Sequence, residues 1–139
     1  MLTNQVALVT GASRGIGKAI ALDLAAQGAI VIGTATSEKG AQAISDYLKE
    51  AGAQGRGACL NVTEPEMITE VLSAVTKEFG TPTVLVNNAG ITRDNLLMRM
   101  KDDEWDDIIQ TNLNSVFRMS KACLRGMMKA KGGRIINIA

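Results

Sequence analysis

The sequence contains no histidine and only two cysteines among its 139 residues. The absence of histidine excludes histidine metal ligands, a histidine general base and a Ser-His-Asp triad on this chain. Cys59 and Cys123 are far apart in the sequence and do not form a metal-ligand pair. Since no secretory signal precedes them, we expect two free thiols in a reducing, cytoplasmic environment.

An excess of charge of one sign is lacking as well. Lys and Arg number 15 against 14 Asp and Glu, so the net charge of +1 provides no field for nucleic acid or an anionic membrane. No apolar run approaches the roughly 18 to 20 residues that a membrane span needs. Hydrophobic residues make up 46% and charged residues 21% of the chain, a composition typical of a globular protein. The length suffices for one domain but not for two.

Short β-rich runs alternate with longer amphipathic patterns along the chain. We expect strands near 6–9, 29–32, 57–60, 84–86 and 134–139, and helices near 16–27, 41–51, 64–79 and 103–131, with a loop at 91–102. Such alternation predicts an α/β fold, a doubly wound parallel sheet with helices on both faces, formed as a single unit by residues 1–139.

Two local patterns refine the predicted helices. Thr63 and Glu66 have the spacing of a capping box, which predicts that Thr63 caps the third helix. Apolar side chains at helical spacing, from Ile16 to Leu24, predict the buried stripe of the first helix.

Glycines gather between the first strand and the first helix, in the run Thr10-Gly11-Ala12-Ser13-Arg14-Gly15-Ile16-Gly17. Gly11 permits a tight turn, and Gly15 and Gly17 let the start of the helix approach both a ligand and the sheet. The free N–H groups and the dipole of a helix N-terminus favour an anion. The pattern therefore predicts a dinucleotide site, and the alternative is a turn whose glycines serve packing only. It is not a Walker A loop, because no Gly-Lys-Ser/Thr follows.

The end of the second strand bears on the choice of nucleotide. Enzymes that prefer NAD usually place an acid there for the ribose hydroxyls. Here Thr36 and Ser37 offer hydroxyls, and Arg14 offers a positive charge for a 2′-phosphate. Glu38 is the counter-argument. If Glu38 begins the next helix and points away, the sequence predicts NADP.

Three asparagines stand at positions suited to a site. Asn88 follows the fourth strand and Asn61 the third, where ligands of open α/β sheets bind, although asparagine is also a common turn former. Asn112 lies on the inward stripe of the long helix, counted from Trp105 through Ile109. Asn112 is either a structural residue bonded to a neighbouring carbonyl or a residue beside a reaction site.

Basic residues concentrate at the end of the long helix and beyond it, namely Lys121, Arg125, Lys129, Lys131 and Arg134. They complement the helix dipole, and they also suit an acidic carrier protein.

The glycine run and Asn87-Asn88-Ala89-Gly90, about 70 residues apart, together resemble the short-chain dehydrogenase/reductase superfamily. Within it, the runs Gly33-Thr34-Ala35-Thr36-Ser37 and Ile91-Thr92-Arg93-Asp94-Asn95-Leu96-Leu97-Met98-Arg99-Met100 are similar to bacterial 3-oxoacyl-[acyl-carrier-protein] reductases. The resemblance covers the whole chain. It implies a Rossmann-type fold, NADPH as cofactor, an acyl carrier protein as partner, a role in fatty acid biosynthesis and a homotetramer paired through the long helix.

The resemblance also implies roles for single residues. It assigns the pyrophosphate and ribose to Gly11, Ala12, Ser13, Arg14 and Ile16, the 2′-phosphate to Arg14 and Thr36, adenine to Asn61 and Val62, and the ribose beside the nicotinamide to Asn88 and Gly90. It makes Asn112 a catalytic residue that holds a water in the proton relay, and it places Lys129 and Lys131 in the carrier-docking region.

The sequence departs from this family at its end. The catalytic Ser and the Tyr-x-x-x-Lys pair are expected beyond Ala139, as the rest of a domain of about 250 residues. We therefore expect the 139 residues to be inactive in ketone reduction by themselves. Two alternatives remain, a non-catalytic module for nucleotide binding or pairing and a methyltransferase that uses S-adenosylmethionine. Arg14 and Thr36, without an acid closing the second strand, argue against the methyltransferase.

Overall fold

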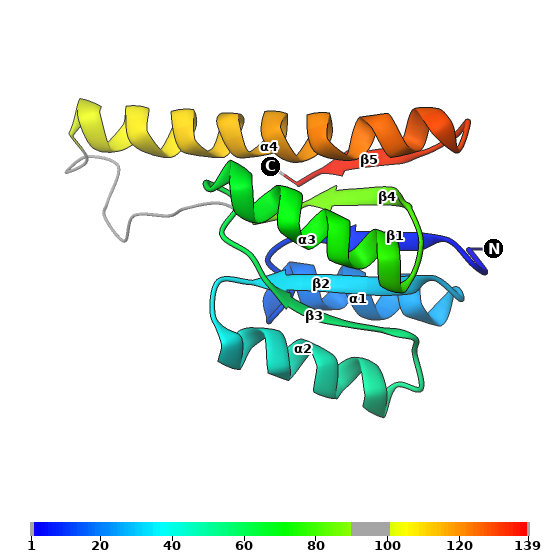
Figure 1. Ribbon diagram of the computed structural model, residues 1–139. Helices are drawn as coiled ribbons and strands as arrows, with labels where there is room; N and C mark the ends of the chain where they lie inside the picture. The colour runs from blue at the N-terminus through cyan, green and yellow to red at the C-terminus, as the bar shows by residue number, and fades with distance from the viewer. Residues whose placement is uncertain (1, 90–100, 139) are drawn as a thin grey trace.

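The computed structural model describes residues 2–89 and 101–138. Within these residues, five parallel strands form one sheet in the order β3-β2-β1-β4-β5 (Figure 1). The elements are β1 (Val6–Val9), α1 (Gly15–Ala26), β2 (Ile30–Ala35), α2 (Glu38–Glu50), β3 (Gly55–Cys59), α3 (Pro65–Glu78), β4 (Pro82–Asn87), α4 (Asp102–Lys129) and β5 (Arg134–Asn137). The predicted alternation is confirmed, and the strand order is that of a Rossmann-type fold.

Helices cover both faces of the sheet, as the sequence predicts. Successive residues of a strand point to opposite faces, so Leu8 packs with Val75 of α3 and Met119 of α4 in one cluster. Val9 packs with Ile44 of α2 in the other cluster, which α1 completes. Because both faces are covered, β1 and the centre of β4 (Val84, Leu85 and Val86) are apolar and buried.

The strand order reverses between β1 and β4. The chain runs outward from β1 to β2 and β3, and then returns to place β4 on the other side of β1. The segments that leave β1 and β4 therefore run in opposite directions across the sheet. They diverge at the carboxyl ends of these two strands, on the left of Figure 1. Ligands of open α/β sheets bind at such a switch point.

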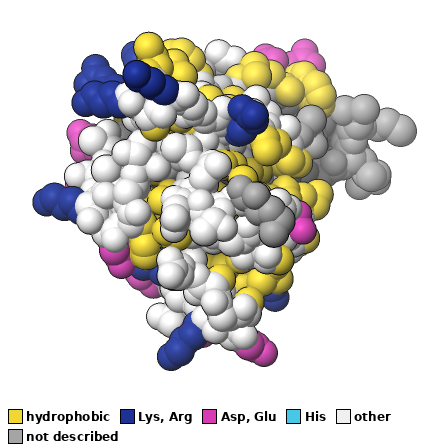
Figure 2. All heavy atoms as spheres, turned by 90° about the vertical axis from the view of Figure 1, so that its right-hand side faces the viewer, with side chains coloured by type: hydrophobic (Ala, Val, Ile, Leu, Met, Phe, Trp, Pro, Cys, Tyr) yellow, Lys and Arg dark blue, Asp and Glu magenta, His cyan; other side chains and the backbone are white. Residues whose placement is uncertain are grey.

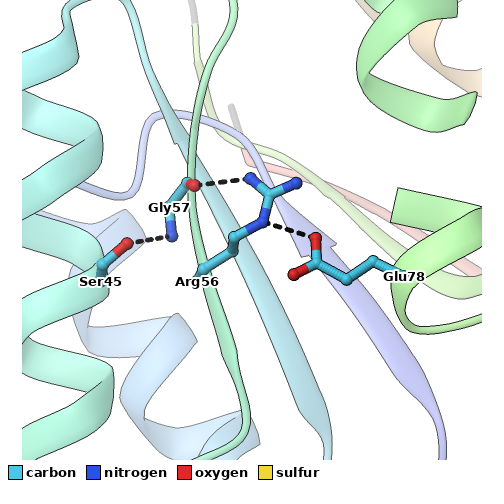
Figure 3. A network of polar contacts seen from close by, with 4 residues as sticks. All are labelled: Ser45, Arg56, Gly57 and Glu78. Atoms are coloured by element: carbon cyan, nitrogen blue, oxygen red, sulfur yellow. Dashed lines mark hydrogen bonds and ion pairs between the residues drawn. The ribbon is translucent and has the colours of Figure 1, made fainter. Parts of the chain in front are cut away.

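The edge strand β3 is held by α2 and α3 through polar contacts (Figure 3). Arg56 Nε donates to Glu78 Oε2 at 2.8 Å, and the N–H of Gly57 donates to Ser45 Oγ at 2.9 Å. A Cβ atom at Gly57 would collide with the carbonyl oxygen of Ala41, so α2 lies directly on the strand. The bond to Ser45 occupies the N–H of Gly57 on an edge that would otherwise present free backbone groups.

The start of α3 corrects the predicted capping box. The helix begins at Pro65, its N-cap residue is Glu64, and no side chain caps it. The Thr63 hydroxyl instead donates to Asn61 Oδ1 at 2.7 Å, and the N–H of Thr63 donates to the same oxygen at 3.0 Å. The prediction was wrong because a local turn formed by Asn61 takes the threonine that the box requires.

The first and second strand-helix units also differ from the expectation in detail. Ile16 is 63% exposed, and the residues of α1 that are buried against the sheet are Gly17 and Ala21. The close approach of α1 at Gly17 is as predicted. Ile20 and Leu24 of the predicted stripe pack partly buried against the core, and Ile16 departs from it. Strand β2 extends three residues beyond the predicted end, to Ala35, because its last residues pair with Gly57, Ala58 and Cys59 of β3.

Helix α4 begins one residue before and ends two residues before the predicted bounds. Its N-terminal half projects past the carboxyl edge of the sheet (Figure 1). Trp105 and Ile109 are consequently 49% and 39% exposed. The prediction that the inward-facing stripe of the long helix includes these two residues was wrong. The buried stripe is Ser115, Met119, Cys123 and Met127. Of the loop expected at 91–102, residues 91–100 lie outside the described residues. Its last residue, Asp102, is the first residue of α4.

Candidate nucleotide-binding site

Three glycines, Gly11, Gly15 and Gly17, shape the turn between β1 and α1. Gly11 and Gly15 have φ values of +63° and +60°, in the left-handed region that favours glycine. A Cβ atom at Gly17 would collide with the Gly11 carbonyl oxygen and would lie 2.6 Å from Asn88 Nδ2. The first turn of α1 is therefore pressed against both the glycine turn and the end of β4.

Both backbone polar groups of Ala12 are held by hydrogen bonds from outside the turn. Its N–H donates to the carbonyl oxygen of Thr34 in β2 at 2.8 Å, and its carbonyl oxygen accepts the hydroxyl of Tyr47 in α2 at 2.7 Å. Ala12 itself is fully buried, whereas Ser13 is half-buried and Arg14 is exposed. The buried anchor thus precedes two polar residues that remain accessible at the surface.

The N-terminus of α1 is left open for an anion. Its N-cap residue, Arg14, has an extended backbone and makes no side-chain cap, and no acidic residue occupies the first turn. The first N–H groups of a helix have no partner within the helix, and its dipole favours negative charge there. A phosphate group fits these donors and the adjacent Arg14 guanidinium.

Thr10 joins the glycine turn to the end of β4. This threonine is 1% exposed, and its hydroxyl oxygen accepts the N–H groups of Asn88 at 3.0 Å and Ala89 at 2.9 Å. In return, Asn88 Nδ2 donates to the Gly11 carbonyl oxygen at 3.0 Å. The two motifs that lie about 70 residues apart in the sequence therefore form one hydrogen-bonded junction at the switch point.

A pocket opens beside this junction, on the side of α3 and α4. Its lining includes Gly11, Thr36, Asn61, Val62 and Ala89. The same pocket is lined by Thr34, whose hydroxyl oxygen is the one buried side-chain polar atom without a hydrogen-bond partner in the described part of the chain. A buried polar atom of this kind is satisfied when a bound molecule supplies a partner.

The acid nearest the end of β2 lies outside this pocket. Glu38 is the first residue of α2, and Ser37 is its N-cap, with the Ser37 hydroxyl oxygen accepting the N–H of Gly40 at 3.0 Å. Glu38 is exposed and lines a separate depression with Arg56. The strand therefore ends without a carboxylate directed at the pocket.

Asn112 is half-buried on α4, and its neighbours Thr111 and Ser115 line the pocket. It continues the buried stripe of α4 by one further turn, at i−7 from Met119. The structure thus places Asn112 near the site, but its role in the proton relay stays a prediction.

Most of the predicted cofactor residues lie at this one edge of the sheet. The pocket brings together Gly11, Thr36, Asn61 and Val62, and hydrogen bonds add Asn88. Ala12 is the buried anchor, while Ser13, Arg14 and Ile16 lie on the outer side of the turn. Gly90 lies outside the described residues. Asn61 Oδ1 accepts the N–H of Thr63. Asn61 therefore forms a turn, which was the structural alternative considered for it in the sequence.

Comparison with known proteins identifies the family. The profile described as short chain dehydrogenase matches residues 5–139. The chain belongs to this family. Among curated proteins, it is 69% identical over 134 residues to 3-oxoacyl-[acyl-carrier-protein] reductase FabG of Escherichia coli, covering 96% of this chain and 54% of the relative. The proteins of the same name from Vibrio cholerae and Pseudomonas aeruginosa are 70% and 60% identical over 137 residues, covering 99% of this chain and 55% and 56% of those relatives.

The chain thus spans about half the length of the curated relatives it matches. The resemblance drawn from the glycine run and the Asn-Asn-Ala-Gly run is confirmed at the level of this short-chain dehydrogenase family. In the part of the chain that the structure describes, no helix has the length and hydrophobicity needed to cross a membrane. The same residues contain no group of three or more His, Cys, Asp or Glu side chains suited to a metal ion.

Two residues that hold the site together were missed in the sequence. Thr10 gave a usable signal, since a hydroxyl at the end of a fully apolar strand must find partners when it is buried. Tyr47 gave none, because its partner Ala12 lies 35 residues away in the sequence.

Proposed function

We propose that this chain provides the NADPH-binding part of an enzyme that reduces 3-oxoacyl-[acyl-carrier-protein] to the 3-hydroxyacyl form in fatty acid biosynthesis. The observation that carries the proposal is the junction of Thr10, Gly11 and Asn88 at the switch point. It supports a nucleotide site because it connects an open helix N-terminus with a pocket at the carboxyl edge of the sheet. The names of the similar proteins supply the substrate class.

The distribution of charge favours NADPH over NADH. Arg14 is exposed at the start of α1, and Thr36 lines the pocket at the end of β2. Glu38, which argued for NADH in the sequence, begins α2 and does not line that pocket. A 2′-phosphate therefore meets a guanidinium and a hydroxyl here without facing a carboxylate.

Within the reaction, the cofactor supplies a hydride, and this part of the enzyme holds and orients it. We propose that Gly11, Ser13 and Ile16 hold the pyrophosphate and ribose, and that Asn61 and Val62 contact adenine. Asn112 is proposed to hold a water of the proton relay. The single tyrosine of the sequence, Tyr47, donates to the Ala12 carbonyl oxygen and is not positioned as the proton donor. We propose that the proton donor is the tyrosine of the Tyr-x-x-x-Lys pair of the family.

Titration of the purified protein with NADPH and NADH tests this function. We expect tighter binding of NADPH, and we expect Arg14→Ala to weaken NADPH binding about tenfold or more, as loss of a charge-assisted hydrogen bond implies. NADH should be affected less, because it lacks the 2′-phosphate. Tighter binding of NADH by the unaltered protein would overturn the cofactor assignment. Turnover of an acetoacetyl thioester by the 139 residues alone would contradict the assignment of the proton donor.

The surface of α4 supports two partners. Leu113, Phe117 and Met128 are 61%, 64% and 70% exposed, which suits pairing with a second copy along α4 in a homotetramer. Basic side chains lie beside apolar ones over the C-terminal end of α4 (Figure 2). Lys129 and Lys131 in this region suit an acidic acyl carrier protein. Both partners, like a cytoplasmic location, belong to the proposed function.

A pairing module without catalysis is the second candidate, and the exposed apolar residues of α4 favour it. The two candidates differ in one measurement. A pairing module that has lost its cofactor function binds neither NADPH nor NADH while it still forms oligomers in sedimentation experiments.

A further inference from the structure

The only tyrosine in the sequence reaches from α2 to the glycine turn. The Tyr47 hydroxyl donates to the Ala12 carbonyl oxygen at 2.7 Å, a short hydrogen bond between residues 35 positions apart. Neither the glycine motif nor the strand ends include this residue. Its contact is nevertheless with the buried peptide that leads directly into Ser13 and Arg14.

The Ala12 carbonyl determines how the following residue is presented. In a trans peptide the C=O of one residue and the N–H of the next point in opposite directions. Because Tyr47 holds the Ala12 carbonyl toward α2, the Ser13 N–H is directed away from α2. The Thr34 carbonyl holds the Ala12 N–H at 2.8 Å, so the peptides on both sides of Ala12 are fixed from outside the turn.

Tyr47 is itself held in place and kept protonated. Lys18 of α1 lies over its ring, with Nζ 5.2 Å from the ring centroid. Burial raises the pKa of the Tyr47 phenol to about 12, so the hydroxyl remains a donor throughout the physiological pH range. The ring thus bridges α1 and α2, the two helices that flank the turn.

A second part of α2, at Gly40, also lies close to the turn. A Cβ atom at Gly40 would lie 2.7 Å from the Ala35 Cβ and 3.6 Å from the Ser13 Cβ. Gly40 and Tyr47 are seven residues apart and therefore lie on the same face of α2. Helix α2 accordingly supports the turn at two points, one beside Ser13 and one at Ala12.

We propose that Tyr47 is a positioning residue that sets the conformation of Ser13 and Arg14 through the Ala12 carbonyl, and thereby the affinity for the 2′-phosphate of NADPH. This inference rests on the proposed nucleotide-binding function. Tyr47 is not among the residues that line the proposed nucleotide pocket, so its effect on binding is indirect. Its hydrogen bond to the Ala12 carbonyl gives the direct connection to the turn.

A double-mutant cycle of Tyr47→Phe and Arg14→Ala tests the proposal. Loss of one hydrogen bond corresponds to about a two- to tenfold rise in the Kd for NADPH in the otherwise unaltered protein. In the Arg14→Ala background we expect Tyr47→Phe to raise that Kd less than twofold, because the guanidinium, the charged group through which it acts on the 2′-phosphate, is already absent. Kd values for NADH should change less than those for NADPH in both backgrounds.

The matched control is Gln42→Ala, which removes a hydrogen bond of 2.8 Å to Asp46 on the same helix without contact with the turn. It should leave both Kd values unchanged. Amide hydrogen exchange of the peptide containing Ser13 should increase in Tyr47→Phe and not in Gln42→Ala, a readout that remains available for a destabilised variant at low temperature.

The outcomes separate the two proposals. If the unaltered protein binds neither NADPH nor NADH, the proposed function fails. If it binds NADPH and Tyr47→Phe has no effect, or the same effect in both Arg14 backgrounds, Tyr47 is only structural and the inference is overturned.

Discussion

Replacement of Thr10 by valine removes a single hydroxyl from the centre of the site. Valine has nearly the same shape as threonine, so packing against the neighbouring strands is retained. The hydroxyl oxygen accepts two backbone N–H groups, from Asn88 at 3.0 Å and from Ala89 at 2.9 Å. Its substitution therefore leaves both donors without their acceptor, at the point where the end of β4 meets the glycine turn.

The expected cost follows from these two bonds. An N–H group left unsatisfied in a buried position costs about 1–3 kcal/mol. Since Asn88 and Ala89 are half-buried, we take the lower part of that range for each and expect Thr10→Val to reduce the free energy of unfolding by about 2–4 kcal/mol. Thr10→Ser keeps the acceptor and loses one buried methyl group, which costs about 1 kcal/mol.

Urea unfolding followed by far-UV circular dichroism compares the two variants with the unaltered protein. NADPH titration of the folded variants supplies a second measurement, since the freed Asn88 segment belongs to the proposed site. We expect Thr10→Val to be the less stable variant and to bind NADPH more weakly than Thr10→Ser. If Thr10→Val is as stable as Thr10→Ser, the hydroxyl does not hold the junction and the reasoning from the two bonds is refuted.

Gly17→Ala should reduce the free energy of unfolding by about 1–3 kcal/mol, because its Cβ collides with backbone, whereas the Cβ of Gly132→Ala meets no atom within 4 Å and this variant should be near neutral in the same unfolding assay. Glu78→Gln should cost less than about 1 kcal/mol, because its ion pair with Arg56 is partly exposed, and a larger loss in urea unfolding would contradict this. Burial raises the Tyr47 pKa from 10.0 to about 12, so its contribution to stability is complete below pH 10 and is lost as the pH rises toward 12. Tyrosinate absorbance of this single tyrosine should therefore appear near pH 12, and appearance near pH 10 would show that the phenol is not buried.

The fold was largely predictable because buried parallel strands are apolar runs and covering helices are amphipathic. Sequence periodicity did not show whether each apolar residue packs against the sheet or faces solvent. Trp105 and Ile109 have helical spacing like the core residues, but the end of α4 that carries them extends past the sheet. Ile16 likewise fits the stripe of α1, yet it is exposed at the start of the helix, whereas Ile20 and Leu24 of the same stripe pack against the core.

The site was predictable where chemistry is concentrated in short runs. Alone, the glycine turn and Asn88 each had an ordinary structural alternative, and it was their combination that indicated the short-chain dehydrogenase family, which the comparison confirms. What could not be predicted was how these runs are connected. The contacts of Thr10 with Asn88 and of Tyr47 with Ala12 join positions 78 and 35 residues apart, and such pairs appear only when the strand order and the helix positions are known.

These connections also explain why the glycine turn depends on both of its flanks. On one side, Thr10 and Asn88 bind the turn to β4 through hydrogen bonds on Gly11 and on the segment after the strand. On the other side, Tyr47 binds it to α2 through Ala12. Ser13 and Arg14 follow directly after these two anchors, Ser13 half-buried and Arg14 exposed. A turn fixed at Gly11 and Ala12 presents its next residues in a defined orientation before any ligand arrives, so less conformational entropy is lost on binding.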